Sequence, residues 1–471
     1  PLTIDPPVRL WATYYGGGNL SDYAYDCTTD SLGNVYLAGS SNSFNNIATV
    51  GAHKDTATDN SEAFLVKFNS DGVRQWGTYY GGFELETGKS CVCDPSNNVY
   101  LLGITRSDTM ISTPGAFQET GYGGWNDVFL VKFNSAGVRQ WGTYYAGDQI
   151  DNPFYCSADI FGNVYITGST ESETGNFASP GAHQDTLGGD WDAFIAKFDG
   201  SGNRLWGTYY GGEERETGGE CAISSFGTVY FPGYTKSDSA IATPGTFQDT
   251  IKGDYDGFIA VFNSGGTLQR ATYFGDTLQD ILFNASLDNF GHLYVTGYTK
   301  SDNGITTTGA FQTAFGGIQD GLLLKMDTAL NNLSWSTYFG AADYDYVNGI
   351  SVNSGGDKVH ISGFTRSTSG LTTPGAYQET FGGGTDDAYI ARFDSSGSRI
   401  WCTYYGKHNR EYTVKNCLDT DENIYLSFTT WTDSGLSSTG AHQEIFGGGS
   451  SDGFLVKFSN DSTEISAGFS F

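Results

Sequence analysis

The strongest constraint on the fold of this chain is an internal repeat. A stretch of the form W-x-T-Y-[YF] begins at six tryptophans, and the stretch RATYFGD carries arginine in the tryptophan position. Consecutive copies begin 64 to 66 residues apart, at Trp11, Trp76, Trp141, Trp206, Arg270, Trp335 and Trp401. Seven copies fill the 471 residues, so we expect seven equivalent structural units.

Each copy predicts four β-strands. In the second copy the strand-like runs are SCVCD (90–94), NVYLLGI (98–104), VFLVKF (128–133) and VRQWGTYY (138–145). Turns rich in Gly, Asn and Asp separate such runs, and the chain has 66 Gly, 30 Tyr and 32 Phe but only 2 Met. Four antiparallel strands in each of seven units predict an all-β, seven-bladed β-propeller, with strands A to D running outward from the axis.

The two chain ends predict how the ring closes. The last copy reaches residues 453–458 and is followed by a predicted C-terminal tail, 459–471, that lacks a strand D. The surplus run VRLWATYY (8–15) supplies that strand from the N-terminal end. We therefore expect residues 1–471 to form a single propeller domain in which the N-terminal strand completes the last blade and removes two exposed sheet edges.

Runs such as GNVYLAGS, DAFIAKFDGSGNRLWGTYYGG and TPGAFQET resemble the SBBP repeat of bacterial secreted and surface proteins, over nearly the whole chain. The resemblance implies a seven-bladed propeller and an extracellular or cell-surface location. It also implies proteins often found in Bacteroidetes, some of which resemble cargo of the type IX secretion system. No C-terminal sorting domain is visible in the sequence.

The charge balance restricts the partners. With 24 basic and 53 acidic residues the net charge is −29, which disfavours nucleic acid and direct membrane insertion or adsorption. Basic proteins, neutral glycans, metal cations and other domains of a larger surface protein remain open. No apolar run is long enough to span a membrane, and no signal-like segment begins the chain, which suggests a mature fragment or an excised domain.

Positions that recur in every copy are interpreted as structural. Histidine shares one position with Phe and Tyr, and four cysteines share one position in strand A, so both indicate packing. These residues are His53, His183 and His442, and Cys27, Cys91, Cys156 and Cys221. No cysteine spacing predicts zinc, and GSSDG (449–453) lacks the helix that follows a nucleophile elbow.

A basic residue recurs inside strand C, where a half-buried cation needs a carboxylate partner. It is Lys67, Lys132, Lys197, Lys325, Arg392 or Lys457, with Val261 in the remaining copy. One acid that could serve stands just before strand C, but we expect this short carboxylate to accept amides of the turn. That acid is Glu62, Asp127, Asp192, Asp256, Asp320, Asp387 or Asp452.

A second recurring acid precedes strand A and predicts a ring of carboxylates near the axis. Its members are Asp22, Glu86, Asp151, Glu216, Asp280, Asp345 and Glu411, hereafter the acid ring. Seven bare charges would repel one another, so we expect backbone amides to cap each carboxylate and no cofactor to be required. Calcium bound through these oxygens is the alternative.

Function is expected on the end of the propeller that carries the long loops. The D-to-A loops, of about ten residues, and the B-to-C loops, of about twenty, should emerge together there, opposite the tight turns. Residues private to single blades on that face are the candidate ligand-binding residues. They are Phe83, Glu84, Asp148, Phe154, Glu213, Glu214, Arg215, Asp343, Tyr344, Tyr346, Lys407, His408, Arg410 and Tyr412.

Three functions fit these residues. The favoured one is a non-catalytic binding or adhesion scaffold that recognises a protein or glycan at the cell surface. The first alternative is an extracellular polysaccharide-active enzyme that uses two loop carboxylates as acid and base. The second is a purely structural spacer of a larger surface protein. No triad, phosphate-binding loop or zinc motif supports catalysis, and no catalytic residue is assigned.

Overall fold

The computed structural model of the protein describes residues 7–18, 20–58, 61–122 and 125–460. Blade I comprises β2 (Asp22–Thr29), β3 (Val35–Ser41), β4 (Glu62–Phe68) and β5 (Arg74–Tyr80), and blade II comprises β6 (Glu86–Cys93), β7 (Val99–Thr105), β8 (Asp127–Phe133) and β9 (Arg139–Tyr145). Blade III comprises β10 (Asp151–Ala158), β11 (Val164–Thr170), β12 (Asp192–Phe198) and β13 (Arg204–Tyr210), and blade IV comprises β14 (Glu216–Gly218), β15 (Ala222–Ile223), β16 (Val229–Thr235), β17 (Asp256–Phe262) and β18 (Leu268–Phe274). Blade V comprises β19 (Asp280–Leu287), β20 (His292–Thr299), β21 (Asp320–Asp327) and β22 (Leu333–Phe339), and blade VI comprises β23 (Gly349–Val352), β24 (Val359–Thr365), β25 (Asp387–Phe393) and β26 (Arg399–Tyr405). Blade VII comprises β27 (Glu411–Leu418), β28 (Ile424–Thr430), β29 (Asp452–Phe458) and β1 (Arg9–Tyr15).

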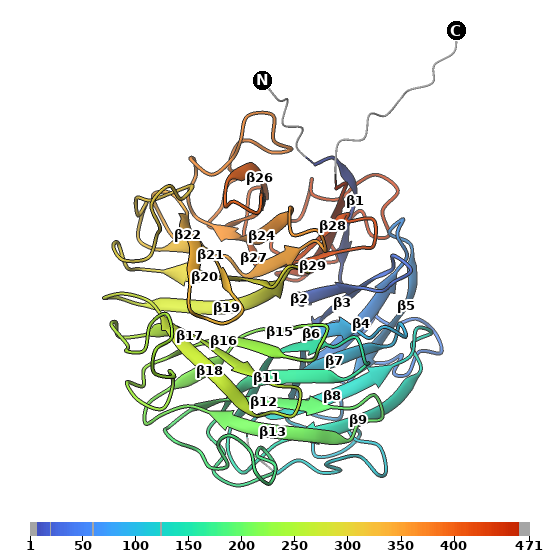
Figure 1. Cartoon of the computed structure of the whole chain (residues 1–471). Coiled ribbons are helices and arrows are strands. Elements are labelled where there is room, and N and C mark those ends of the chain that lie inside the picture. Colours follow the sequence, from blue (N-terminus) through green and yellow to red (C-terminus); the bar gives the residue numbers. More distant parts are fainter. Residues whose placement is uncertain (1–6, 19, 59–60, 123–124, 461–471) are drawn as a thin grey trace.

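The predicted seven-bladed propeller is confirmed. Seven antiparallel sheets follow one another around an axis in sequence order, as the colours of Figure 1 show. The strand A of each blade lies nearest the axis, because the inner strands β2, β6, β10, β15, β19, β23 and β27 contact one another in this order around the ring. Every regular element assigned in the described residues is a strand.

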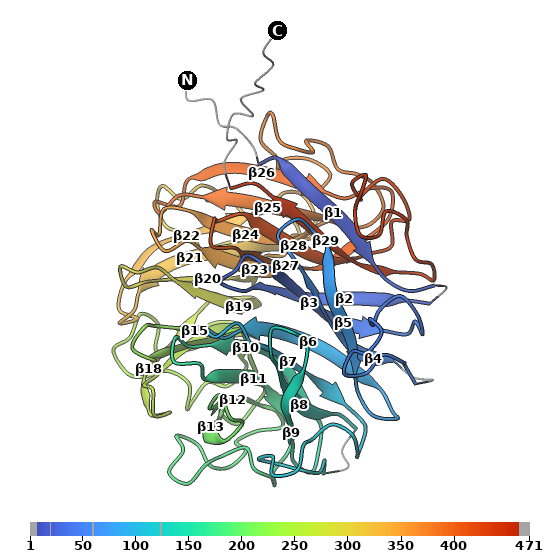
Figure 2. The ribbon, with the colours of Figure 1, turned by 90° about the vertical axis from the view of Figure 1, so that its right-hand side faces the viewer.

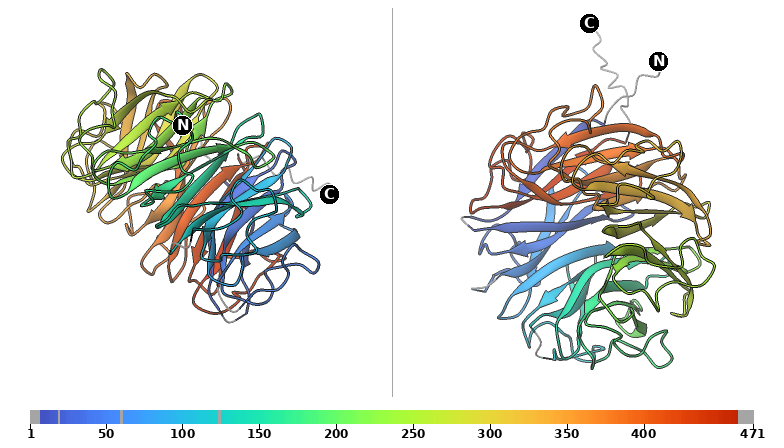
Figure 3. Two further views of the ribbon diagram at one scale, coloured as in Figure 1. Left: turned by 90° about the horizontal axis from the view of Figure 1, so that it is seen from below. Right: turned by 90° about the vertical axis from the view of Figure 1, so that its left-hand side faces the viewer.

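Ring closure by the N-terminal strand is also confirmed. Strand β1 pairs antiparallel with β29, with Tyr15 opposite Gly453 and Arg9 opposite Phe458. Figure 2 shows blue β1 beside the last blade, and both views of Figure 3 show blue strands beside orange-red ones. Of the predicted C-terminal tail, residues 461–471 lie outside the described residues.

In five blades the recurring tryptophan donates its indole N–H to the C-to-D turn of the next blade, and in four of them the recurring lysine donates to the same turn. Trp76 Nε1 and Lys67 Nζ both donate to the carbonyl of Ser135, at 3.1 and 3.3 Å. Gly137, two residues further along, has φ +80°, and a Cβ there would lie 2.8 Å from the indole ring of Trp76. The tryptophan of the repeat therefore requires a glycine in the C-to-D turn of the following blade.

The partner of the recurring strand-C cation differs from the acid suggested by the sequence. Lysine pairs with the aspartate of the A-to-B turn, at 3.3 Å in Lys67–Asp30 and 3.1 Å in Lys132–Asp94. Lys197–Asp159 and Lys457–Asp419 repeat the contact. The acid before strand C lies at the opposite end of the strand and accepts amides of its own turn, as expected: Asp192 accepts the amide of Gly188 over 2.8 Å. The expected ion pair itself is confirmed in these four blades.

The histidine and cysteine positions pack as expected. His53 lies 5.9 Å from the ring of Tyr80 and 5.7 Å from that of Phe133. Burial, followed by the charge of Arg139, lowers the pKa of His53 to about 4. Cys91 and Cys156 are buried in clusters that join neighbouring blades, so this position supplies inter-blade core.

The loops from strand D to strand A are shorter than the sequence suggested. Five residues separate β5 from β6 and β9 from β10, not ten. Strand A begins at the acid-ring residue itself and contains a β-bulge, for example between Gly88 and Ser90. The bulge interrupts the strand pattern, which hid the first half of the strand from sequence reasoning.

Candidate functional site

The two sets of loops meet at one end of the propeller, as predicted. The backbone amide of Glu216, at the end of a D-to-A loop, donates to the carbonyl of Trp191, at the end of a B-to-C loop, over 2.7 Å. Asp280 donates to Tyr255 over 2.8 Å in the next blade. Each acid-ring residue makes this contact through its amide, and these contacts define the long-loop face.

The acid ring is fully buried beneath this face and is capped by its surroundings. Each of the seven carboxylates accepts the amide of a residue in its own D-to-A loop, such as Gly212 for Glu216 at 2.8 Å. Hydroxyls complete the shell: Thr235 and Ser237 donate to Glu216 over 2.5 and 2.7 Å. These bonds supply the amide caps that the sequence analysis expected and fasten strand B to strand A.

A second buried carboxylate faces each acid-ring member across the first residue of the loop. A Cβ on Gly406 would lie 2.4 Å from Asp387 Oδ1 and 2.5 Å from Glu411 Oε2. Burial raises the pKa of Asp387 to about 7 and that of Glu411 to about 8, with smaller contributions from the charges of Asp386 and Asp387, respectively. Both carboxyls therefore keep a proton at pH values well above those at which exposed acids release it.

One blade differs at this position. In blade I, Lys54 replaces the glutamine found in the other six copies, and its Nζ lies 2.6 Å from both oxygens of Glu62. In blade III, by contrast, Gln184 donates to Asp192 over 2.5 Å and accepts the amide of Gly211 over 2.9 Å. A cation at the carboxylate pair is thus built into one blade, while an amide serves the others.

An open acidic pocket of about 600 Å³ lies on the long-loop face between blades III and IV, hereafter the acidic pocket. It is lined by Asp148, Gln149, Glu171, Glu173, Asp190, Trp191 and Arg215. Four of these seven residues are acidic, and the single cation, Arg215, lies with its guanidinium 5.1 Å from the ring of Trp191. The pocket therefore presents four carboxylates around one aromatic ring.

A residue that occurs at its repeat position only in blade III contributes to the charge of this pocket. The position after strand B is basic in blades II, IV, V and VI, as in Arg106 and Lys236, and it is Glu171 only in blade III. In blade IV the cation Lys236 covers Tyr255, 4.6 Å from its ring, and pairs with Asp254. Glu171 reverses the charge at that place, so blade III has no matching cation on strand B.

Asp148 is held in position at the rim of the pocket. Its carboxylate accepts the amide of Thr174 over 3.1 Å, and Gly147 forms a bridge with Gly175 beside it. Burial slightly opposes the charge, but hydrogen bonds led by that of Thr174 hold the pKa of Asp148 below its usual value. The carboxylate is therefore ionised and oriented before any ligand binds.

The predicted site residues differ in their exposure on the long-loop face. Phe83, Glu84, Glu213 and Glu214 are exposed on the long-loop face, with Phe83 65% exposed. Asp343 and Tyr344 are half-buried there, with the Arg366 guanidinium 5.2 Å from the Tyr344 ring. The structure brings Asp148 and Arg215 together in the acidic pocket, with Glu213 and Glu214 in the same loop as Arg215.

The predicted basic residues of the last blade, Lys407, His408 and Arg410, and the aromatic residues near them differ in their contacts within the fold. Arg410 bonds Asp386 over 2.7 Å, with its guanidinium 4.0 Å from the Tyr412 ring, and His408 lies 3.1 Å from Asp433. Lys407 is exposed in the same loop. The rings of Tyr346 and Tyr412 lie 4.3 and 4.4 Å from that of Phe364, in a stack that joins blades VI and VII.

The axis of the propeller holds a polar network that crosses between blades. Lys415 Nζ lies 3.1 Å from Glu220 and 2.5 Å from Asn284 Oδ1, and 4.0 Å from the ring centroid of Tyr155. Phe154, a predicted site residue, lines the axial cavity on the long-loop side of this network. Lys415 thus links four blades and lines two cavities near the axis.

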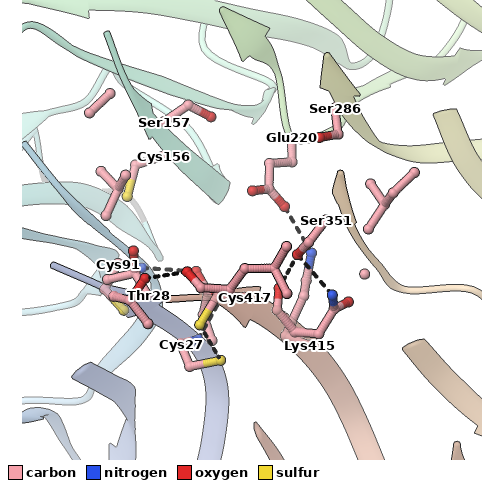
Figure 4. A pocket seen from close by; sticks show the side chains of 18 of the residues that line it. Cys27, Thr28, Cys91, Cys156, Ser157, Glu220, Ser286, Ser351, Lys415 and Cys417 are labelled. Carbon is pink, nitrogen blue, oxygen red and sulfur yellow. Dashed lines mark hydrogen bonds and ion pairs between the residues drawn. The ribbon is translucent and has the colours of Figure 1, made fainter. Parts of the chain in front are cut away.

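The larger cavity, of about 380 Å³, is hereafter the axial chamber (Figure 4). Its wall carries the five thiols of Cys27, Cys91, Cys156, Cys221 and Cys417, beside Ser and Thr hydroxyls. Burial, followed by the charge of Glu220, raises the pKa of Asp26 at its edge to about 6. Burial also raises the pKa of the Cys91 and Cys156 thiols, so these sulfurs are neutral.

Sequence reasoning missed Glu171, Glu173, Asp190 and Trp191 in the pocket, and Asp26, Tyr155, Glu220 and Lys415 at the axis. The first set was detectable, because Glu171 reverses the sign of a repeat position. The second set stands at the position directly before the Cys27-type residue of strand A, which is filled by a different residue in each of the seven blades, so recurrence did not mark it. In blade IV, strand A is divided into β14 and β15, which pair with β16 on either side of Pro232. Proline has no amide hydrogen to donate to strand A. Only its carbonyl forms a hydrogen bond there, accepting the amide of Gly219.

Comparison with known proteins agrees with the repeat pattern. Residues 10–48 match the family model described as a beta-propeller repeat, SBBP. The chain carries an SBBP repeat. Together with the seven blades, this match supports the family resemblance of the whole array.

A relative from Caulobacter vibrioides, the regulatory protein FlaEY, is 23% identical over 301 residues. The match covers 60% of this chain and 30% of that protein. Among solved structures, Sqt1 from Chaetomium thermophilum is 10% identical with a TM-score of 0.44, covering 97% of this chain and 99% of Sqt1. YCF48 bound to D1 peptide is 10% identical with a TM-score of 0.43, covering 98% and 99%.

The described residues contain neither a membrane-spanning helix nor a cluster of metal ligands. None of their elements is a helix long and apolar enough to cross a membrane. Within the same residues, no three His, Cys, Asp or Glu side chains are grouped so that they could hold a metal ion.

Proposed function

We propose that this propeller is a non-catalytic binding scaffold, outside the cell or on its surface, that holds a basic segment of a protein partner on its long-loop face. The observation that carries the proposal is the acidic pocket, where Asp148, Glu171, Glu173 and Asp190 surround Trp191. Lysine and arginine side chains suit such a site, because carboxylates bind their charge and an indole face attracts a cation.

The long-range charge of the molecule supports the same partner. A net charge of −29 attracts a cationic segment and accelerates its encounter with the pocket. Arg215 already lies against the face of Trp191, so the pocket binds one cation of its own chain in the manner proposed for the ligand.

The structural role of the buried acid-ring carboxylates supports the proposal of a scaffold. Acid-ring carboxylates such as Glu216 are fully buried and bonded to loop amides and hydroxyls, which makes them fasteners of the fold. The loops that they fasten form the walls of the acidic pocket, so the pocket stands on a rigid base.

The test is a binding titration by fluorescence anisotropy with a lysine- and arginine-rich peptide, and with an acidic peptide as the ligand control. We expect the basic peptide to bind and its affinity to fall steeply with salt. Glu171→Lys combined with Asp190→Lys should weaken binding by about tenfold or more, equivalent to about 1.4 kcal/mol. Charge reversal at Glu213 and Glu214 should also weaken binding.

Matched controls lie on the opposite end of the propeller. Asp71→Lys and Ser201→Lys change the charge of exposed C-to-D turns and should leave the affinity unchanged. A glycan array and a polysaccharide turnover assay run on the same protein. Binding to neutral glycans alone, or turnover of a polysaccharide, would overturn the proposal.

A further inference from the structure

The seam between the last and first blades brings two cysteine thiols into contact. Cys417 Sγ in β27 lies 3.4 Å from Cys27 Sγ in β2, and Figure 4 shows the two side chains pointing toward each other at the wall of the axial chamber. A disulfide has an S–S distance of about 2.0 Å. A small rotation of the two side chains would therefore bring the sulfurs within bonding distance.

Threonine hydroxyls hydrogen-bond β2 to β27 on both sides of the thiols. Thr29 Oγ1 donates to the carbonyl of Leu418 over 2.6 Å, and Thr413 Oγ1 donates to the carbonyl of Ala24 over 2.9 Å. The two cysteines lie between these bonds in both strands. Their approach is therefore set by the fold and does not depend on mobile loops.

The pairing is peculiar to this seam. In two other seams the same two positions meet, as Ser157 Oγ with the Cys221 carbonyl at 2.8 Å and Ser351 Oγ with the Asn416 carbonyl at 3.2 Å. The position of Cys417 is filled in the other six blades by Thr28, Val92, Ser157, Ala222, Ser286 and Ser351. Only the junction of blades VII and I therefore places a cysteine at both positions.

We propose that Cys27 and Cys417 are an oxidation site at which a disulfide locks the propeller ring. The chain itself runs from blade VII to blade I only through β1, which is held to β29 by hydrogen bonds and leads into β2. A bond between Cys27 and Cys417 joins residues 390 positions apart, across the innermost strands. It therefore closes the ring covalently at the seam where β1 closes it by hydrogen bonds.

The oxidant is a small-molecule disulfide, and the reaction is thiol–disulfide exchange. One cysteine, as its thiolate, attacks the small disulfide, forming a mixed disulfide and releasing one small thiol. The second cysteine loses its proton and attacks the sulfur of the first, forming the Cys27–Cys417 bond and releasing the second small thiol. Two protein thiols are oxidised, and one small disulfide is reduced to two thiols.

Burial and the neighbouring Cys27 raise the pKa of the Cys417 thiol, so exchange in the folded protein is slow. The experiment therefore refolds the full chain from urea with oxidised glutathione, and in parallel with dithiothreitol. Thiols are then titrated under denaturing conditions, and disulfide-linked peptides are identified by mass spectrometry without reduction.

We expect the seven thiols of the reduced protein to fall to five, with one linked peptide pair containing Cys27 and Cys417. Cys417→Ser should keep all of its six thiols. Cys91→Ser, at the position equivalent to Cys27 but without a cysteine partner, should fall from six to four. The oxidised wild type should unfold at a higher urea concentration than the reduced form, and dithiothreitol should abolish the difference.

Seven thiols retained after oxidative refolding would overturn the proposal, as would a linked pair other than Cys27 and Cys417. A wild-type disulfide at these positions without any change in the urea midpoint would overturn the locking role. Both readouts come from the wild-type chain, so the test does not depend on the folding of a variant.

Discussion

Glu411→Gln tests whether the buried carboxylate pairs set the pH dependence of stability. Glu411 lies beside Asp387, and Thr430 donates to Glu411 over 2.8 Å. The glutamine keeps an acceptor for Thr430 and gains an amide that can donate to Asp387 Oδ1, which has no hydrogen-bond partner. The substitution therefore removes a titrating group from a site that accommodates an amide.

The magnitude follows from the pKa of Glu411, which burial raises from 4.5 to about 8. Between these values the folded carboxyl keeps its proton and the unfolded one releases it, so the free energy of unfolding falls as pH rises. One pKa unit corresponds to about 1.4 kcal/mol. The group therefore withdraws about 3 to 4 kcal/mol of stability between pH 5 and pH 8, an upper estimate.

The assay is urea unfolding of wild type and Glu411→Gln at intervals from pH 5 to pH 8, with Asp71→Asn as an exposed control. We expect the variant to gain stability relative to wild type as pH rises, by up to about 1.4 kcal/mol per unit. The control should follow the wild type. Parallel curves for Glu411→Gln and wild type would refute the reasoning.

Three further predictions concern the scaffold. Deletion of residues 1–15 removes β1 and exposes β29 and its core, and thermal denaturation should show a loss of many degrees; a loss of only a degree or two contradicts closure by β1. Gly137→Ala forces a Cβ against Trp76 at φ +80° and should lower the free energy of unfolding by about 2 kcal/mol or more in urea titrations, whereas Gly115→Ala, with equal φ and open space, should lose less. Calorimetry with Ca²⁺ on chelator-treated protein should show no stoichiometric heat, because amides and hydroxyls already cap the acid ring; stoichiometric binding that Glu216→Gln with Asp280→Asn abolishes would make the ring a metal site.

Much of the fold was predictable because the same four-strand pattern recurs seven times in the sequence. The tryptophan spacing predicted the number of blades. The strand-D-like run at residues 8–15, which precedes the first complete repeat, predicted that the N-terminal strand completes the last blade. Recurrence could not reveal the partner of the strand-C lysine. Asp30 and Glu62 both recur in equivalent positions, and only the strand direction places Asp30 beside Lys67.

The candidate site was less predictable, because private residues gain meaning only from their neighbours in space. Glu213 and Glu214 stood out as a cluster in sequence, yet the pocket gathers Asp148 from a D-to-A loop and Glu171 and Asp190 from the two ends of a B-to-C loop. Tyr346 and Tyr412 have the composition of a binding surface, but the structure stacks them on Phe364. Exposure and packing, which separate these cases, are set by tertiary contacts.

The most direct test of the proposed function is hydrogen–deuterium exchange of the full chain with and without the basic peptide. Binding at the acidic pocket should slow exchange in residues 147–150, 171–175, 188–191 and 213–215, and leave the turns at 69–73 and 199–203 unchanged. Protection confined to those turns, or none at saturating peptide, would contradict a long-loop binding face.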